Sequence, residues 1–431
     1  MTYEEAMAYI HSVNWLGSRP GLERITVLCE KLGHPERELR FIHVGGTNGK
    51  GSFCCMLSNI LREAGYKTGL YTSPYIERFN ERMQIDSCPI PDAELAELTA
   101  QVRAVADEMD DPPTEFELIT ALCFLYFRNN RCDYVVLEVG LGGRLDSTNI
   151  IPAPVLAVIT GIDYDHTAIL GDTTAEIAAE KAGIIKSSCP VLFGEGDDDA
   201  ARVIREKATA ECGAERYHRT DYDKITDVRL TPDSTVFTYG AYRDITMHML
   251  GLYQLKNAAN VLTAVDLLRE AGLDLPENAV YAGMAAAHWP ARFEKLMTEP
   301  LVFYDGAHNP QGIRGAAENI RHYLSPLQAD GKIVLCMGVL RDKDFSAMIG
   351  MLASLADKVF TITPDNPRAL PAAETAQVFR DHGTQAQDAQ TLEAGVLSAL
   401  AYAGETGRPL VVLGSLYIYG DVKKSIMKVQ K

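Results

Sequence analysis

The chain has 431 residues, of which 47% are hydrophobic and 23% are charged. A disordered chain would be poorer in hydrophobic residues and a membrane protein would be richer, so the composition favours a globular protein of two or three domains. Lys and Arg total 41 against 58 Asp and Glu, and the net charge of -17 disfavours nucleic acid and anionic membranes as partners.

Apolar runs of strand length alternate with amphipathic helical patterns from residue 41 to residue 160. This alternation predicts a doubly wound α/β fold, in which helices cover a parallel sheet. The predicted strands are 41–44, 68–72, 133–139 and 155–160, with helical patterns at 53–61 and 116–127. Loops rich in Gly, Ser, Asp and His follow these strands, and ligands bind at that edge of such sheets.

The pattern changes between residues 190 and 250, where three short strands, 226–230, 236–239 and 245–250, predict a separate antiparallel patch. The α/β alternation restarts at residue 301, with predicted strands 301–304, 332–337, 358–363 and 410–413. A second, smaller α/β domain is therefore expected, and Thr298–Pro300 is a reasonable linker before it. We predict two domains, residues 1–297 and 298–431.

The Gly-rich segment Gly45–Gly51 joins the first predicted strand to a helix. Glycines let a backbone turn its N–H groups around phosphate oxygens, the helix N-terminus adds positive potential, and Lys50 reaches the outer phosphates. The usual phosphate loop has Gly at the position of Val44 and Ser or Thr directly after the lysine, where this chain has Gly51 and only then Ser52. The segment is therefore predicted to be a shorter variant of that loop.

Polar side chains at other strand ends are candidate ligands for a divalent cation. Glu138 lies in an apolar strand, where a carboxylate is costly unless it binds a cation or is paired with Arg or a helix N-terminus. Ser73 ends a strand, and His166 follows Asp163 and Asp165 in a loop. Taken alone, Ser73 is unremarkable, and a single histidine such as His166 is more often a hydrogen-bonded loop residue than a metal ligand.

The segment Asp305–Pro310 follows a predicted strand of the second domain. It places an acid, an imidazole and an amide in one turn at the ligand-binding end of that strand. Asp, Gly, Asn and Pro all favour turns, so both a bare turn and a binding turn remain open.

The nine cysteines include no Cys-x-x-Cys pair and no zinc-ligand spacing, which is typical of reduced thiols in a cytoplasmic protein. Glu4 and Glu5 stand where a signal peptide would carry Lys or Arg. The longest apolar segment, 118–127, is about half the length that a membrane span needs. We therefore expect a cytoplasmic protein with no membrane partner.

Considered together, the motifs resemble those of folylpolyglutamate synthases, ATP-dependent enzymes of the Mur ligase superfamily. The resemblance extends from about Tyr9 to Tyr419 with the motifs in order. They are the segments 46–52, 72–74, 79–82, 114–117, 138–146 with 148–149, 165–166, 180–184, 254 with 257, 289–290 with 292, 305–310, 342–344 and 414–417. The resemblance implies an N-terminal phosphate-loop ATPase domain with a parallel sheet and a small antiparallel patch, followed by a smaller Rossmann-like glutamate-ligase domain.

The resemblance also implies roles for individual residues in binding ATP and Mg²⁺. Lys50, Lys181 and His308 would be catalytic, with His308 orienting the γ-phosphate or the attacking amine, and Lys181 matches a lysine that is often carbamylated in the family. One or two Mg²⁺ ions are implied as cofactors. The implied ATP contacts are Gly49, Lys50, Gly51, Ser52, Asn257, Arg292 and Asp305, and the implied metal ligands are Ser73, Glu138, His166 and Lys181.

A pterin-side pocket is implied by two further segments. Its residues would be Thr114, Glu115, Phe116 and Glu117 together with Leu145, Asp146 and Ser147. The chain departs from the family at Tyr75 and Tyr253, where His is usual, and at Ala291, where Gly is usual. These positions flank the implied ligands, so they bear on pocket detail more than on reaction class.

The implied activity is ATP-driven addition of L-glutamate to the γ-carboxylate of a folate, in folate biosynthesis and one-carbon metabolism. Arg144–Asp146 also resembles members that make dihydrofolate from dihydropteroate, so a second activity stays open. Two alternatives are a sister ligase acting on a cell-wall nucleotide precursor and a nucleotide-binding switch without ligase activity. Segments 79–82 and 138–146 argue against the first, and the lack of an Asn-Lys-x-Asp segment argues against a GTPase. The expected partners are folate, L-glutamate and ATP, and the expected state is a monomer.

Overall fold

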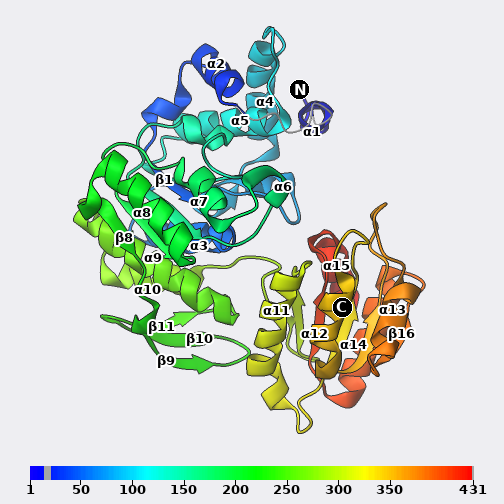
Figure 1. Cartoon of the computed structure of the whole chain (residues 1–431). Coiled ribbons are helices and arrows are strands. Elements are labelled where there is room, and N and C mark those ends of the chain that lie inside the picture. Colours follow the sequence, from blue (N-terminus) through cyan, green and yellow to red (C-terminus); the bar gives the residue numbers. More distant parts are fainter. Residues whose placement is uncertain (14–20, 430–431) are drawn as a thin grey trace. The chain divides into compact units, whose positions relative to one another are not determined.

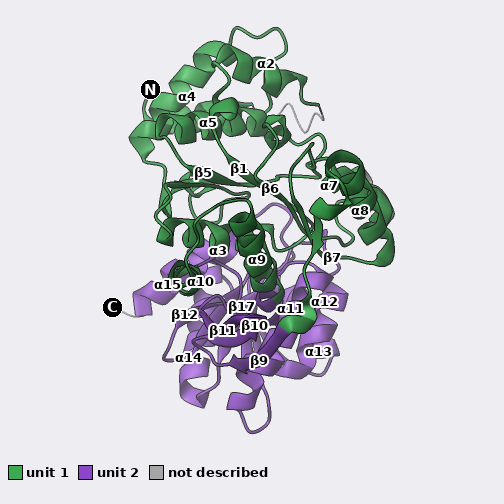
Figure 2. Ribbon diagram, turned by 90° about the vertical axis from the view of Figure 1, so that its left-hand side faces the viewer, with its two compact units in different colours: residues 1–224, 256–287 green, residues 225–255, 288–431 purple. Residues whose placement is uncertain are grey.

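The computed structural model describes residues 1–13 and 21–429, apart from the side chains of residues 167 and 168. Backbone contacts divide the chain into two units (Figures 1 and 2), each described by itself. Unit 1 contains residues 1–224 and 256–287, and unit 2 contains residues 225–255 and 288–431. The antiparallel patch is thus grouped with unit 2, and the domain division at residues 297 and 298 stays a prediction.

Unit 1 is built on an eight-stranded sheet of order β4-β3-β2-β5-β1-β6-β7-β8. The six strands from β2 to β8 in this order are parallel, and β3 and β4 add an antiparallel edge. Its central strands are buried throughout, as expected when helices cover both faces. The strands are β1 (Phe41–Gly45), β2 (Thr68–Tyr71), β3 (Met83–Ile85), β4 (Cys88–Pro89), β5 (Tyr134–Glu138), β6 (Leu156–Gly161), β7 (Val191–Glu195) and β8 (Tyr217–Arg219).

Helices cover both faces of this sheet. Figure 2 shows α2, α4 and α5 on one face of β5, β1 and β6, with α3, α9 and α10 on the other. The first group buries one apolar core with the sheet, and α7 and α8 bury a second core against β6 and β7. The helices are α1 (Tyr3–Ser12), α2 (Glu23–Lys31), α3 (Lys50–Glu63), α4 (Asp92–Ala106), α5 (Glu115–Asn129), α6 (Thr167–Leu170), α7 (Thr174–Ala182), α8 (Asp198–Cys212), α9 (Leu252–Glu270) and α10 (Glu277–Ala286).

Unit 2 contains a three-stranded antiparallel sheet and a six-stranded sheet. The first is β11-β10-β9, with β9 at Ile225–Leu230, β10 at Thr235–Tyr239 and β11 at Tyr242–Met247. The second has the order β12-β13-β17-β14-β15-β16, and only β12 runs antiparallel to its neighbour. Its strands are β12 (Glu294–Met297), β13 (Val302–Asp305), β14 (Ile333–Met337), β15 (Ala356–Thr361), β16 (Gln385–Asp388) and β17 (Leu410–Leu413).

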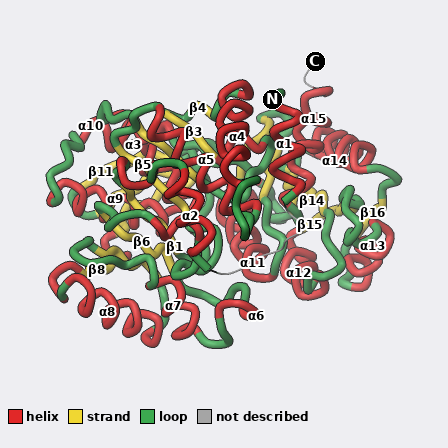
Figure 3. Tube along the Cα trace, turned by 90° about the horizontal axis from the view of Figure 1, so that it is seen from above, coloured by secondary structure: helices red, strands yellow, loops and turns green. Residues whose placement is uncertain are grey.

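The helices of unit 2 pack on the six-stranded sheet, and Figure 3 distinguishes helices in red from strands in yellow along the chain. Apolar residues of α11 and α12 form one buried cluster with β13, β14 and β17. The helices are α11 (Pro310–Asn319), α12 (Phe345–Leu352), α13 (Ala372–Asp381), α14 (Leu392–Thr406) and α15 (Tyr419–Val429).

The predicted α/β fold class is confirmed, and every predicted strand is present with its ends shifted by a few residues. The antiparallel patch is present and begins at Ile225, one residue before its predicted start. Two strands between residues 190 and 225 were not predicted, namely β7 at residues 191–195 and β8 at residues 217–219, which continue the parallel sheet. Val191, Leu192 and Phe193 are fully buried, as a strand inside a parallel sheet requires.

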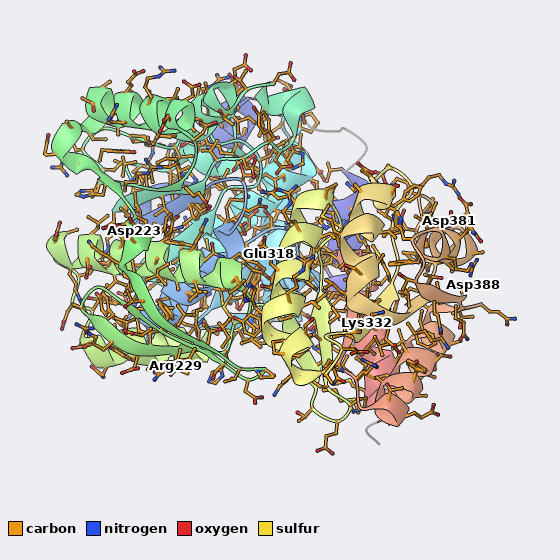
Figure 4. All side chains as sticks on the ribbon, turned by 60° about the horizontal axis from the view of Figure 1, so that its bottom comes forward. Asp223, Arg229, Glu318, Lys332, Asp381 and Asp388 are labelled. Carbon is orange, nitrogen blue, oxygen red and sulfur yellow. The ribbon has the colours of Figure 1, made fainter. Side chains whose placement is uncertain are left out.

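The charged side chains, whose net negative charge disfavours nucleic acid as a partner, lie mostly at the surface. All nine cysteines lie in the described ranges, and each is a free thiol. No helix among the described residues is both long and apolar enough to cross a membrane. Figure 4 labels examples of exposed charged side chains from both units, namely Asp223, Arg229, Glu318, Lys332, Asp381 and Asp388.

Close packing of α10 on α3 gives a test of the fold. A Cβ atom on Gly283 of α10 would lie 2.5 Å from Cα of Ile60 on α3, so Gly283→Ala must push the two helices apart. We expect a loss of roughly 1–3 kcal/mol in the free energy of unfolding, measured by chemical denaturation. Gly404→Ala is the control, because Gly404 is helical and no heavy atom of the described residues lies within 4 Å of the Cβ that alanine would add, so this change should stabilise by roughly 0.4–1 kcal/mol. Equal effects of the two substitutions would contradict this helix contact.

Candidate functional site

The loop between β1 and α3, the predicted phosphate loop, has a backbone conformation that favours glycine at two positions. Gly46 and Gly49 have φ of +139° and +84°, values that residues with a side chain rarely adopt. Gly49 is the N-cap of α3, and among the described residues no side chain caps this helix. The helices α1, α5 and α7 each begin with a threonine capping box instead. The positive potential at this helix N-terminus favours an anion beside the loop.

Two lysines donate to the same carbonyl of this loop. Lys50 Nζ lies 3.1 Å from the carbonyl oxygens of Gly46 and Thr47. Lys181 of α7, only 3% exposed, donates to the Gly46 oxygen at 2.9 Å. Burial, and then the charge of Lys50, lowers the pKa of Lys181 to about 7. The phosphate loop thus holds two ammonium groups whose repulsion an anion would relieve.

Two side chains from other elements hold the loop in place. Thr160, near the end of β6, donates through its hydroxyl to the carbonyl oxygen of Asn48 at 2.7 Å. Asn257 of α9 lies against Gly49, because a Cβ on that glycine would come within 2.3 Å of Asn257 Oδ1. The predicted ATP-contacting residue Asn257 is therefore beside the phosphate loop.

The predicted metal ligands Glu138 and Ser73 lie together at the ends of β5 and β2. Glu138 is 4% exposed, and its Oε2 accepts the backbone N–H of Ser73 at 3.0 Å. Glu138 is the register partner of Val44, the residue before the phosphate loop. Both Glu138 and Lys50 act on the pKa of the buried Cys54 thiol, which burial raises well above its usual value. The carboxylate therefore lies close to the phosphate loop.

His166 belongs to the loop after β6 and is more exposed than the other predicted metal ligands. Its φ is +48°, and its Nε2 lies 3.7 Å from Oδ2 of Asp165. Asp165 in turn acts on Lys181 by its charge, which places this loop on the Lys181 side of the site. Among the described residues no cluster of three or more His, Cys, Asp or Glu side chains is arranged to bind a metal ion.

The four predicted pterin-side residues at the start of α5 have different surroundings. Glu117 is committed to structure, because it accepts the N–H and hydroxyl of Thr114 at 2.7 and 2.9 Å and forms a buried ion pair with Arg24 at 3.0 Å. Glu115 lies 3.2 Å from the His11 ring. Phe116 covers Gly140 so closely that a Cβ there would lie 2.4 Å from its ring. Thr114 and Glu117 thus fix the start of the helix, and Phe116 lies beside the loop that follows β5.

The second pterin-side segment is a turn built around the Asp146 carboxylate. Its Oδ1 accepts the N–H and hydroxyl of Thr148 at 3.0 and 2.6 Å, and its Oδ2 accepts the N–H of Leu141 at 2.9 Å. Burial raises the pKa of Asp146, and these hydrogen bonds oppose the shift. Ser147 is buried, whereas Leu145 is exposed and so accessible to a ligand.

Arg292, Asp305 and His308 belong to unit 2. Asp305 ends β13, is 3% exposed, and accepts the N–H of Ala307 at 2.9 Å. Burial raises its pKa to about 6, and the charge of Arg292 opposes the shift. Across the part of the chain that the structure describes, Asp305 Oδ2 and Tyr253 Oη are buried with no hydrogen-bond partner. His308 Nδ1 lies 2.8 Å from the Gly306 carbonyl oxygen, to which it donates.

The carboxyl ends of β1, β2, β5 and β6 therefore carry or adjoin Lys50, Ser73, Glu138, Lys181 and Asn257, whereas Glu115 and Glu117 contact His11 and Arg24 instead. Sequence reasoning missed Thr160, whose hydroxyl fastens the phosphate loop to the end of β6. It is a single hydroxyl residue in an apolar strand, so the pattern gives no signal for it. Thr47 lies within the predicted loop, and its hydroxyl donates to the carbonyl oxygen of Asp163. The adjacent strand ends were the signal that did find Glu138 and Ser73.

Comparison with known proteins places these features in a family. Residues 44–265 match the Mur ligase middle domain, and residues 291–416 match the Mur ligase glutamate ligase domain. The folylpolyglutamate synthase of Lacticaseibacillus casei is 39% identical, with 99% of each chain covered. The dihydrofolate synthase/folylpolyglutamate synthase of Bacillus subtilis is 35% identical over 98% of this chain and 99% of its own. A solved FPGS–AMPPCP–folate complex is 35% identical, covers 99% of this chain and 100% of its own, and superposes with a TM-score of 0.82.

The lowered pKa of Lys181 can be tested through carbamylation. A neutral amine attacks CO₂, so the buried Lys181 amine should form a carbamate that becomes more abundant as the pH rises through about 7. With ¹³C-bicarbonate, we expect one carbamate carbon signal by NMR. Lys181→Arg is the control, because a guanidinium keeps the positive charge and does not react. A signal that persists in this variant would assign the carbamate to another lysine.

Proposed function

Because the chain belongs to the folylpolyglutamate synthase family of the Mur ligases, we propose that it adds L-glutamate to the γ-carboxylate of a folate and converts ATP to ADP and phosphate. The observation that carries this proposal is the phosphate loop of β1 and α3, with Lys50 and Lys181 on the carbonyl of Gly46. The folate-type segments at residues 79–82 and 138–146 favour this substrate over a cell-wall nucleotide precursor.

The reaction must first make a carboxylate reactive, because oxide is a very poor leaving group. An oxygen of the γ-carboxylate attacks the γ-phosphorus of ATP, and ADP leaves. The amine nitrogen of glutamate then attacks the acyl carbon, inorganic phosphate leaves, and the nitrogen loses a proton. Both steps build negative charge on phosphate oxygens, so pre-arranged positive groups lower the barrier.

The residues of the phosphate loop supply such groups. The N–H groups at the start of α3 and the ammonium of Lys50 bind phosphate oxygens. Lys50 then donates to these oxygens in place of the carbonyl oxygens of Gly46 and Thr47. Asn257 beside Gly49 is proposed to contact the nucleotide. The family resemblance implies that Arg292 and Asp305 contact ATP. It also implies that the imidazole of His308 orients the γ-phosphate or the attacking amine.

The residues at the ends of β5 and β2 fit a magnesium site. Mg²⁺ prefers oxygen ligands and is usually held by one or two carboxylates together with substrate phosphates. The buried Glu138 carboxylate and the Ser73 hydroxyl match this donor set, and His166 is the proposed third ligand. When bound, the ion neutralises phosphate charge, and a carbamylated Lys181 would hold a second one.

A second candidate activity is the synthesis of dihydrofolate from dihydropteroate and L-glutamate. The turn of Leu145, Asp146 and Ser147 favours it, since this segment resembles that of bifunctional members. The chemistry is the same, because a carboxylate is phosphorylated and then attacked by the amine of glutamate. One chain carries every proposed site residue, so we also propose a monomer, which light scattering after gel filtration would test.

The function is tested by Mg-ATP-dependent incorporation of labelled glutamate. We expect incorporation with tetrahydrofolate as acceptor, and incorporation with dihydropteroate as well if the second activity is present. A cell-wall nucleotide precursor in a parallel reaction should give none. Failure of both folate-type acceptors, with ATP still bound, would overturn the substrate assignment.

Lys50 provides the sharpest mutational test. Lys50→Met removes the ammonium and keeps the apolar stem, so we expect incorporation to fall by about 10²-fold or more with little change in the thermal unfolding midpoint. Lys186→Met is the matched control in the same unit, because Lys186 donates to the carbonyls of Asn149 and Ile151 and lies outside the proposed ATP contacts. Substantial activity in Lys50→Met would show that the phosphate loop is wrongly assigned.

A further inference from the structure

An imidazole is buried in the middle of the central strand, where the reaction outlined above does not use it. His43 of β1 is 0% exposed, and its register partners are Leu137 of β5 and Ala157 of β6. Burial, with a smaller contribution from the charge of Lys186, lowers its pKa to about 3, so the ring is neutral. A buried polar ring is costly unless its nitrogens are hydrogen-bonded.

The hydrogen bonds of His43 determine its tautomer. Its Nε2 lies 2.9 Å from Oγ1 of Thr148, and within the described ranges Nδ1 has no hydrogen-bond partner. The single hydroxyl hydrogen of Thr148 points to Oδ1 of Asp146 at 2.6 Å. Thr148 Oγ1 must therefore accept from His43, which places the ring hydrogen on Nε2.

These groups form a directed chain from the strand to the pterin-side turn. His43 donates to Thr148, Thr148 donates to Asp146, and Asp146 accepts the N–H of Leu141 at 2.9 Å. The turn is held independently at its other end, where Asn149 Nδ2 donates to the carbonyls of Arg144 and Gly183. His43 thus acts on the Asp146 side of the turn, between Leu145 and Thr148.

We propose that His43 is a positioning residue for the folate substrate: its Nε2–H orients the Thr148 hydroxyl, which orients the Asp146 carboxylate and the turn that carries Leu145 and Ser147. This proposal rests on the proposed function. Without the Nε2–H, the Thr148 hydroxyl is free to rotate, and the carboxylate of Asp146 loses its shortest hydrogen bond in some of the molecules. The turn then has its binding conformation in only a fraction of the molecules, and the apparent affinity for folate falls by that fraction.

Two substitutions of His43 separate positioning from packing. His43→Leu removes the donor with little change in volume, and His43→Gln places an amide N–H near the position of Nε2. We expect His43→Leu to raise KM for tetrahydrofolate about tenfold, with KM for ATP changed less than about twofold. His43→Gln should recover most of the folate affinity.

Substitutions of Thr148 test the same chain from its other side and stay informative if His43→Leu does not fold. Thr148→Val removes the hydroxyl and keeps the shape, whereas Thr148→Ser keeps the hydroxyl. We expect Thr148→Val to behave like His43→Leu and Thr148→Ser to behave like the wild type. The double variant His43→Leu/Thr148→Val should raise KM for folate no further than either single change, because both break one chain.

The outcomes distinguish this proposal from the proposed function. A wild-type protein that adds no glutamate to tetrahydrofolate overturns both. Given an active wild type, equal increases in the two KM values, no recovery in His43→Gln, or additive effects in the double variant would overturn the positioning role alone. Those results would show that His43 only packs the strand beneath the phosphate loop.

Discussion

The parallel pairing of β1 with β5 and β6 is the constraint on which the unit 1 site depends. This register places Val44 beside Glu138 and Gly45 beside Ile159, so three strands end at one edge. The phosphate loop follows β1 directly, the proposed metal ligand Glu138 ends β5, and Thr160, which fastens the loop, is near the end of β6. A one-residue slip would turn each side chain to the other face of the sheet and separate all three.

Charge explains how a strongly acidic protein holds anionic substrates. The net charge of -17 is distributed over many exposed carboxylates, whereas Lys50 and Lys181 are gathered on one backbone carbonyl. Burial lowers the pKa of Lys181, and the nearby charge of Lys50 lowers it further. Binding energy is therefore available locally, because a phosphate satisfies donors that the loop itself satisfies only with neutral oxygens. The net charge alone would have predicted that the protein disfavours anionic ligands.

The sequence predicted most of the strands that are buried on both faces, although it missed β7, whose residues Val191, Leu192 and Phe193 are fully buried. Such strands read as continuous apolar runs, and β1, β5, β6 and β17 were each located within a residue or two of their ends. Short or polar edge strands were missed, since β4 has two residues and β16 is the polar run Gln385–Asp388. Tertiary contacts determine whether those edge strands form, and the local composition does not indicate them.

The site shows the same division between local and long-range information. Glu138 and Lys50 stand out as charges or glycine-flanked residues in apolar surroundings, so the sequence identifies them. The ion pair that commits Glu117 to the start of α5 joins residues 93 positions apart, and the sequence could not separate this structural role from ligand binding. The tautomer of His43 was equally hidden, because it depends on where Thr148 sends its single hydrogen.

The energetics of His43 indicate why an imidazole at this position is more than core packing. An unpaired buried nitrogen costs roughly 1–3 kcal/mol, which a valine or isoleucine in the same strand would avoid. Replacing both partners of a buried hydrogen bond with apolar groups of similar shape is often nearly neutral for stability. Stability therefore gives no reason for the pair formed by His43 and Thr148, since an apolar pair would fill the same space. What an apolar pair cannot supply is direction: it leaves the Asp146 carboxylate with backbone donors alone and lets the neighbouring turn rotate. A fixed chain of donors from the central strand links the orientation of that turn to the strand from which the phosphate loop begins.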